Sequence, residues 1–127
     1  MTVIRDLLQE VRRTHPDYIV YMPGSQDGST GDTGNEHFHV FDGPDGSLMA
    51  VWTQSTVEGN PDQHIVFSRS LNDGCTWSTP VVIAGGNADP ATGAGMCSWQ
   101  VLMVSQRGRI YVLYSNCLLY TSPSPRD

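Results

Sequence analysis

Glu36, His37 and His39 form a short polar group whose residue types could do chemistry. Alternate residues of a strand share a face, so a His-x-His pair would present two imidazoles together, a spacing that metal ions use. His64 would add a third ligand if its strand lay in register. Neither a Cys-x-x-Cys pair nor a His-Glu-x-x-His helix accompanies them, and a polar strand lining a channel accounts for them equally well. We therefore expect no metal and no cofactor.

Two carboxylates, Glu58 and Asp62, belong to one polar loop. A carboxylic acid can protonate a leaving-group oxygen, which makes both candidate acid/base residues, while the alternative is an ordinary solvated loop acid. Trp99 and Gln100 open a later strand, where the indole could stack on a sugar ring or pack in a core. Arg69 is expected to form a structural ion pair.

Short strands, which begin at about residue 36, are expected to position these side chains. Residues 2–14 are predicted to form an amphipathic helix, because apolar residues recur at helical spacing, and 17–22 form a β-rich run before a polar loop over 23–35. The expected strands cover 37–42, 47–54, 63–70, 80–84, 99–105 and 109–115. The first four would form one antiparallel sheet and the last two a further hairpin.

The two hairpins resemble each other. Each carries apolar residues on both sides of a tight turn, Gly43 to Gly46 in the first and Gln106 to Gly108 in the second. Their offset is roughly sixty residues, and self-similarity at such a period is typical of repeat architectures.

The segment Ser70 to Trp77 is the strongest motif. Asn72 can accept hydrogen bonds from its own backbone, Gly74 can supply a positive φ, Thr76 can bond locally and Trp77 can cover the turn. The segment resembles the Asp-box of sialidases and other BNR-repeat β-propellers. Asn72 stands where that box usually carries Asp, which keeps the accepting oxygen and removes a charge.

The resemblance implies an all-β fold of antiparallel four-stranded blades in a six-bladed β-propeller. About one and a half blades would span residues 36–116, behind an N-terminal region over 1–35 that contains the helix. The implied function is that of an exo-glycosidase that hydrolyses terminal sialic acid or a related sugar. The alternatives are a non-catalytic propeller that binds glycan or protein, and a glycosidase of another specificity.

The resemblance also assigns roles to single residues. Sialidases place their acid/base carboxylate in the loop before the box strand, here the loop of Glu58 and Asp62. Glu36, His37 and Phe38 stand where these enzymes carry Arg-Ile-Pro, so the arginine that grips the sugar carboxylate is absent. The innermost strands would offer Glu36, His37, His39, Trp99 and Gln100 to substrate. Such a set suits a neutral glycan better than a sialoside.

The composition also limits the classes of partner that the protein is expected to bind. The 127 residues carry a net charge of −6, with seven Arg, thirteen acidic residues and no lysine. Clustered positive charge is what nucleic acids and anionic membranes require, so we expect neither as a partner. No apolar run approaches membrane-spanning length and no signal peptide pattern opens the chain, which leaves the compartment and the oligomeric state open.

The last eleven residues, 117–127, match one reading frame of a common transposon-based sequencing adapter. We expect this tail to be foreign to the protein and leave it out of the fold. Cys75 and Cys97 are then the remaining cysteines, and idle thiols are favoured over a disulfide between them.

Overall fold

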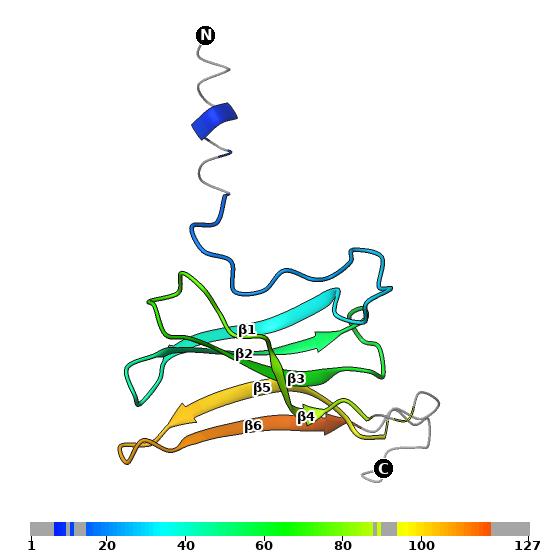
Figure 1. The fold of residues 1–127 in the computed structure, drawn as a ribbon. Coiled ribbons are helices and arrows are strands. Elements are labelled where there is room, and N and C mark those ends of the chain that lie inside the picture. Colours follow the sequence, from blue (N-terminus) through cyan, green and yellow to red (C-terminus); the bar gives the residue numbers. More distant parts are fainter. Residues whose placement is uncertain (1–6, 10, 12–14, 88, 90–93, 118–127) are drawn as a thin grey trace.

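The computed structural model describes residues 7–9, 11, 15–87, 89 and 94–117. A four-stranded antiparallel sheet runs in chain order through β1 (Gly34–Asp42), β2 (Leu48–Ser55), β3 (His64–Ser70) and β4 (Val81–Gly85). A second, two-stranded sheet consists of β5 (Met96–Val104) and β6 (Ile110–Cys117), and it lies beside the first sheet (Figure 1). All six expected strands are confirmed, with ends displaced by a few residues.

The N-terminal region is only partly as expected. Residues 7–9 and 11 are helical, and the rest of the helix expected over 2–14 lies outside the described residues. The strand expected over 17–22 is wrong, because this run is irregular. Val20 and Tyr21 instead pack against the buried residues of the first sheet. The β-prone side chains therefore cover a core without joining a hydrogen-bonded ladder.

The centre of the first sheet is covered on both faces, so β2 is buried almost throughout, including its polar residues Thr53, Gln54 and Ser55. One face carries Ala50, Trp52 and Val66, covered by Val20, Tyr21 and Trp77. The other face carries Val51 and Ile65, which pack against Cys97 of β5. Burying two faces of one short sheet supplies most of the apolar burial that stabilises this chain.

The two hairpins are structural copies of each other. Gly34 pairs with Ser55 in the first, and Met96 pairs with Cys117 in the second, an offset of 62 residues that every other pair in the two ladders also shows. The expected repeat of roughly sixty residues is confirmed at 62. Both turns close in the same way, with Gly46 N donating to Gly43 O and Gly108 N donating to Ser105 O.

The described helical residues include no stretch that is long and apolar enough to cross a membrane. The tail expected to be foreign lies outside the described residues, apart from Cys117 at the end of β6. Cys75 is exposed and Cys97 is buried.

Candidate functional site

The candidate residues and the Asp-box-like turn lie at opposite ends of the sheets. In an antiparallel arrangement, the starts of β1, β3 and β5 meet the ends of β2 and β4. Glu36, His37 and Trp99 belong to this end, as does the loop that carries Glu58. The turn over 70–77 joins β3 to β4 at the other end. The box therefore shapes the scaffold and takes no part in the candidate site.

A β-bulge interrupts both hairpins at the same repeat position. The ladder shifts between Glu36 and His39 in the first hairpin and between Ser98 and Val101 in the second. The bulged residues His37 and Trp99 have left-handed φ values of 54° and 58°, which is uncommon for residues other than glycine. Strain of this kind clusters at functional sites, and here it recurs in both repeats.

The two strained residues meet across the sheets. The imidazole of His37 and the indole of Trp99 have ring centroids 4.5 Å apart, with an angle of 31° between their planes. Trp99 remains 66% exposed. His37 Nδ1 lies 3.4 Å from the hydroxyl of Thr53, which holds the ring over the end of β2. The result is an aromatic platform with one open face.

Polar groups surround this platform. Glu36 lies opposite Thr53, and the exposed His39 lies opposite Val51, so both belong to the face of the first sheet that meets β5. Among the described residues, Glu36 Oε1 and Ser98 Oγ are buried without a hydrogen-bond partner. These two atoms also occupy equivalent positions of the two repeats. Buried polar atoms without a partner are rare in native proteins, so the recurrence of two at equivalent repeat positions is notable.

Gln100 is buried, unlike the other residues expected to contact substrate. Its amide nitrogen donates to His37 O and lies 3.4 Å from Val51 O, while its oxygen accepts from the Thr53 hydroxyl at 2.7 Å. The side chain thus fastens β5 to β1 and β2 directly behind the platform. It positions the two rings and presents no free polar atom to a ligand.

His64 is separate from the histidines of β1. Its Nδ1 lies 2.8 Å from Asp62 O and its Nε2 lies 3.2 Å from Gln54 Oε1, which orients the ring within the β2–β3 end. In the described part of the chain, no three His, Cys, Asp or Glu side chains gather as metal ligands.

The two loop carboxylates differ in their environments. Asp62 accepts from Thr56 N at 3.1 Å, from Asn60 Nδ2 at 2.7 Å and from the Thr56 hydroxyl. Burial alone would raise the pKa of Asp62, but these hydrogen bonds outweigh it and hold that pKa below its ordinary value. An acid that is ionised so readily is a poor proton donor, and its hydrogen bonds indicate that it shapes the loop.

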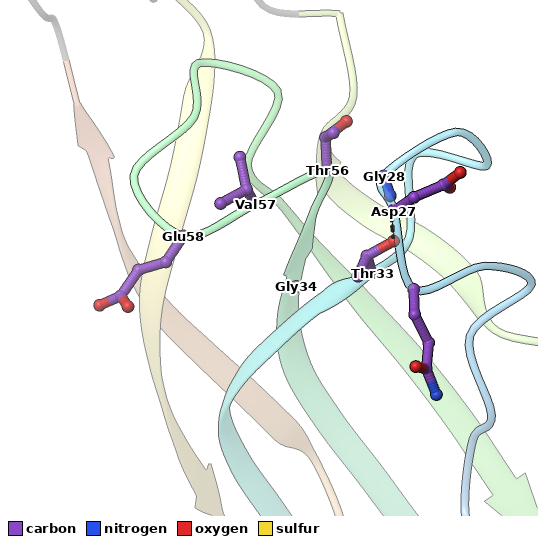
Figure 2. Close-up of a pocket in the computed structure, with 8 residues that line it drawn as sticks. Asp27, Gly28, Thr33, Gly34, Thr56, Val57 and Glu58 are labelled. Carbon is purple, nitrogen blue, oxygen red and sulfur yellow. Dashed lines mark hydrogen bonds between the residues drawn. The ribbon is translucent and has the colours of Figure 1, made fainter.

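Glu58 is exposed and lines a cleft of about 420 Å³ between its loop and the N-terminal loop. The cleft is lined by Gln26, Asp27, Gly28, Thr33, Gly34, Thr56, Val57 and Glu58. Figure 2 shows the Glu58 side chain pointing away from Asp27 and Thr33. The carboxylates of Glu58 and Asp27 therefore do not converge on one point. None of the residues that line this cleft is positively charged.

The turn over 70–77 has the local hydrogen bonds predicted from its residue types. Ser70 Oγ accepts from Gly74 N at 2.8 Å, and Asn72 Oδ1 accepts from Thr76 N at 2.9 Å. Trp77 Nε1 donates to Gly74 O at 3.0 Å, and Gly74 has the positive φ, 90°, that the turn requires. The segment is thus a hydrogen-bonded turn in which Asn72 supplies the accepting oxygen.

Two features escaped the sequence reasoning: the paired bulges and the clasp formed by Gln100. The repeat is the sequence feature that could have revealed the paired bulges, because its 62-residue offset aligns His37 with Trp99 and Glu36 with Ser98. A scan against models of known protein families finds no match to this chain, and a search of curated proteins finds none either.

Proposed function

We propose that this chain is part of an Asp-box β-propeller of the sialidase-like class and that its paired bulges bind a glycan. Support for the architecture comes from the 62-residue repeat, the face-to-face packing of the two sheets and the box turn between β3 and β4. Support for glycan binding comes chiefly from one observation, the exposed Trp99 ring stacked on His37. A flat ring with neighbouring polar groups suits the apolar face and hydroxyls of a sugar.

The glycan favoured by this surface is neutral. Glu36 supplies a carboxylate, Ser98 a hydroxyl, and His37 and His39 supply imidazoles, while no arginine lies among the described residues of this end. A sialoside carries its own carboxylate, which would face Glu36 without a cation to offset the repulsion. Hydroxyl groups can both donate and accept, so they can pair with the unsatisfied Glu36 Oε1 and Ser98 Oγ.

Hydrolysis of a glycosidic bond is the second candidate function, and Glu58 favours it. Glu58 is an exposed carboxylic acid on a cleft at the same end of the sheets as the platform. The mechanism would need a second catalytic group opposite it, and Asp62 is engaged in its own loop. Binding without hydrolysis is therefore the conclusion that the geometry supports best.

The test of the binding function compares three forms of the chain on one panel of neutral oligosaccharides and sialyllactose. Wild type should bind at least one neutral oligosaccharide by isothermal calorimetry, and Trp99→Ala should weaken that binding about fivefold or more, since aromatic contacts contribute about 1 kcal/mol. Leu71→Ala, which alters an even more exposed apolar residue at the opposite end of the sheets, should bind as wild type does. An unchanged affinity in Trp99→Ala, or binding restricted to sialyllactose, would refute the proposal.

Hydrolysis is tested separately with fluorogenic sialosides and neutral glycosides. Turnover that Glu58→Gln abolishes while Asp62→Asn only destabilises the fold would establish the second function. Absence of turnover with every glycoside would leave the binding function as the sole one.

A further inference from the structure

A chain of hydrogen bonds links the two walls of the 420 Å³ cleft through the end of β2. Trp52 Nε1 donates to Asn35 Oδ1 at 2.8 Å, and Gln54 Nε2 donates to the same oxygen at 3.1 Å. Gln54 Oε1 lies 3.2 Å from His64 Nε2, and His64 Nδ1 lies 2.8 Å from Asp62 O. Trp52 and Gln54 are buried, so the chain runs beneath the surface of this end of the sheet.

Each end of this hydrogen-bonded chain holds one wall of the cleft. At the N-terminal loop, Asn35 Nδ2 donates to Asp32 O at 2.8 Å and to Thr33 O at 3.3 Å. At the loop before β3, the Asp62 carboxylate accepts from Thr56 N at 3.1 Å and from the Thr56 hydroxyl. Thr33 and Thr56 both line the cleft (Figure 2). The separation of the walls therefore depends on the bonds between Asn35 and Asp62.

The direction of each hydrogen bond in the chain is fixed from the Trp52 end. An indole nitrogen can only donate, so the Asn35 atom that it meets must be the oxygen, and the Asn35 nitrogen then faces two carbonyl groups. Gln54 must turn its nitrogen toward Asn35 Oδ1 and its oxygen toward His64. A rotated Gln54 amide would set two accepting oxygens against each other.

His64 consequently lies between two acceptors. The backbone oxygen of Asp62 faces Nδ1, and the amide oxygen of Gln54 faces Nε2. Neutral imidazole has one N–H group and one lone pair, so it can donate to only one of these oxygens. The doubly protonated imidazolium donates to both. The hydrogen-bonded chain is therefore complete only when His64 carries a positive charge.

The groups packed around His64 favour the same protonation state. The Asp62 carboxylate, in the adjoining loop, attracts a positive charge on the ring. Gly85 of β4, which stands opposite His64 in the ladder, adds no side chain. On the N-terminal segment, the Tyr21 hydroxyl donates to the Asp32 carboxylate, and β5 packs on the other face of the sheet. The imidazolium thus meets two neutral acceptors and one negative charge.

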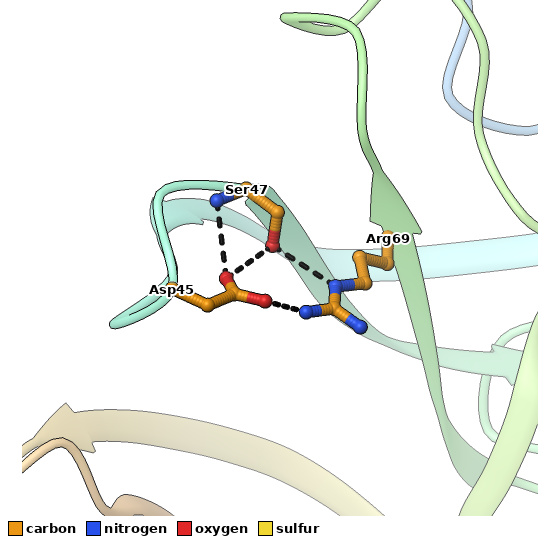
Figure 3. A network of polar contacts seen from close by, with 3 residues as sticks. All are labelled: Asp45, Ser47 and Arg69. Carbon is orange, nitrogen blue, oxygen red and sulfur yellow. Dashed lines mark hydrogen bonds and ion pairs between the residues drawn. The ribbon is translucent and has the colours of Figure 1, made fainter.

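The polar network at the opposite end of the first sheet needs no such proton. Arg69 forms an ion pair with Asp45, and its Nε donates to Ser47 Oγ at 3.0 Å (Figure 3). Ser47 N and Oγ in turn donate to Asp45 Oδ1 at 3.1 and 2.7 Å. Each of these donors meets an acceptor in the charge states that arginine and aspartate keep throughout the neutral range. This network therefore provides a reference within the same sheet.

We propose that His64 is a pH-dependent latch between the two walls of the cleft, closed while its imidazole carries two protons and broken at the Gln54 contact when it loses one. The contact with Asp62 O is the shorter and keeps the remaining N–H, so the Nε2 lone pair would face Gln54 Oε1 and the two atoms would separate. The closed form binds one proton more than the open form, so a rise in pH favours the open form. Histidine changes charge between about pH 5 and 8, which sets the range of the latch. The inference is independent of glycan binding.

The first test follows the ring and its neighbours in the wild-type chain by nitrogen NMR between about pH 5.5 and 8. Both ring nitrogens of His64 should carry a proton at the acidic end, and Nε2 should be the one that loses it. The side-chain amide signals of Gln54 and Asn35 should shift with the same midpoint, because their bonds form one chain. Loss of the proton from Nδ1, or amide signals that ignore the titration of His64, would overturn the proposal.

Native-state hydrogen exchange measures the release of the loop. The Thr56, Asn60 and Gln63 amides all donate within this loop, and the Ser47 amide belongs to the reference network. Relative to Ser47, the protection factors of the three loop amides should fall about fivefold between pH 6 and 8. That change corresponds to the loss of about 1 kcal/mol, the contribution of one hydrogen bond.

Three variants separate the latch from a general effect of pH. His64→Gln removes the titrating ring and Gln54→Met removes the oxygen that faces it, so loop protection in both should be equal at pH 6 and 8. His15→Gln, which alters an exposed histidine N-terminal to both walls, should keep the fivefold fall. Equal protection at both pH values in wild type, or a fall that persists in His64→Gln, would contradict the proposal. If either substitution unfolds the chain, the wild-type NMR titration still decides.

Discussion

Asn72 organises the box turn through both ends of its amide. Its oxygen accepts from Thr76 N at 2.9 Å and from Ser70 Oγ at 3.0 Å, while its nitrogen donates to Thr76 Oγ1 at 2.8 Å. An aspartate in the same place would keep the accepting oxygens, and the Thr76 hydroxyl could rotate to donate to it. The oxygen that accepts from the Thr76 amide is thus the group that the turn requires.

Two substitutions of Asn72 test this interpretation. Asn72→Asp should change the free energy of unfolding by no more than about 0.5 kcal/mol, because every backbone donor keeps its acceptor. Asn72→Ala should lower that free energy by about 1–2 kcal/mol, because Thr76 N loses its partner. Urea denaturation followed by circular dichroism measures both. Asp73→Asn is the control, since Asn tolerates the φ of 58° at this exposed position equally well. Equal losses in Asn72→Asp and Asn72→Ala would contradict the assignment.

The irregular N-terminal segment is held over the core by one carboxylate. Asp32 accepts from Gly24 N at 3.0 Å and from the hydroxyls of Thr30 and Tyr21. The hydrogen bonds from Thr30, Tyr21 and Gly24 lower the pKa of Asp32 to about 2. Burial and the contact with Asp32 raise the pKa of Tyr21 to about 12. The segment that covers Trp52 is therefore fixed by an ionised Asp32 and a neutral Tyr21.

Acid should loosen this segment. A carboxyl whose pKa falls from 3.8 to about 2 on folding contributes stability above pH 4, and the contribution disappears as the pH falls through 2. Thr30→Val removes one donor and should raise the pKa of Asp32, as measured by carbon NMR of its carboxyl. It should also narrow the pH range over which the stability is lost. Ser29 donates a hydrogen bond to Asp27 and not to Asp32, so Ser29→Ala should leave the titration of Asp32 unchanged. A titration of Asp32 that Thr30→Val does not move would exclude this role for Thr30.

The elements also show what the sequence can and cannot predict. Alternating and apolar runs located all six strands, and Gly46 and Gly108 located both turns, because those signals are local. The run over 17–22 differs from the prediction because its β-prone residues pack on a face of the sheet instead of pairing at its edge, and tertiary contacts decide between the two. The bulges at His37 and Trp99 carry no clear local signal, because positive φ is uncommon even for histidine, in which it is enriched, and tryptophan does not share that enrichment. The two bulges place the rings of His37 and Trp99 in contact, and this contact is not predicted by the polar residues of β1 and β5.

At the level of the whole molecule, one side chain couples the two sheets. Gln100 of β5 bonds to His37 O and Thr53 Oγ1 of the first sheet, and it is almost fully buried. On the same interface, Leu102 and Val112 pack against the cluster of Val51, Ile65 and Cys97. Apolar packing is non-directional, so the hydrogen bonds of Gln100 are what set the position of Trp99 against His37.

Removal of the Gln100 side chain should allow the smaller sheet to open independently of the larger one. Gln100→Ala leaves the Thr53 hydroxyl and the His37 carbonyl buried without this partner and should lower the free energy of unfolding by about 2–3 kcal/mol. Native-state hydrogen exchange should then show faster opening of β5 and β6 than of β2 and β3, because the larger sheet keeps its second covered face. Gln106→Ala, in the exposed turn between β5 and β6, should change neither quantity. If both sheets of Gln100→Ala still opened together at the wild-type free energy, apolar packing alone would position the platform.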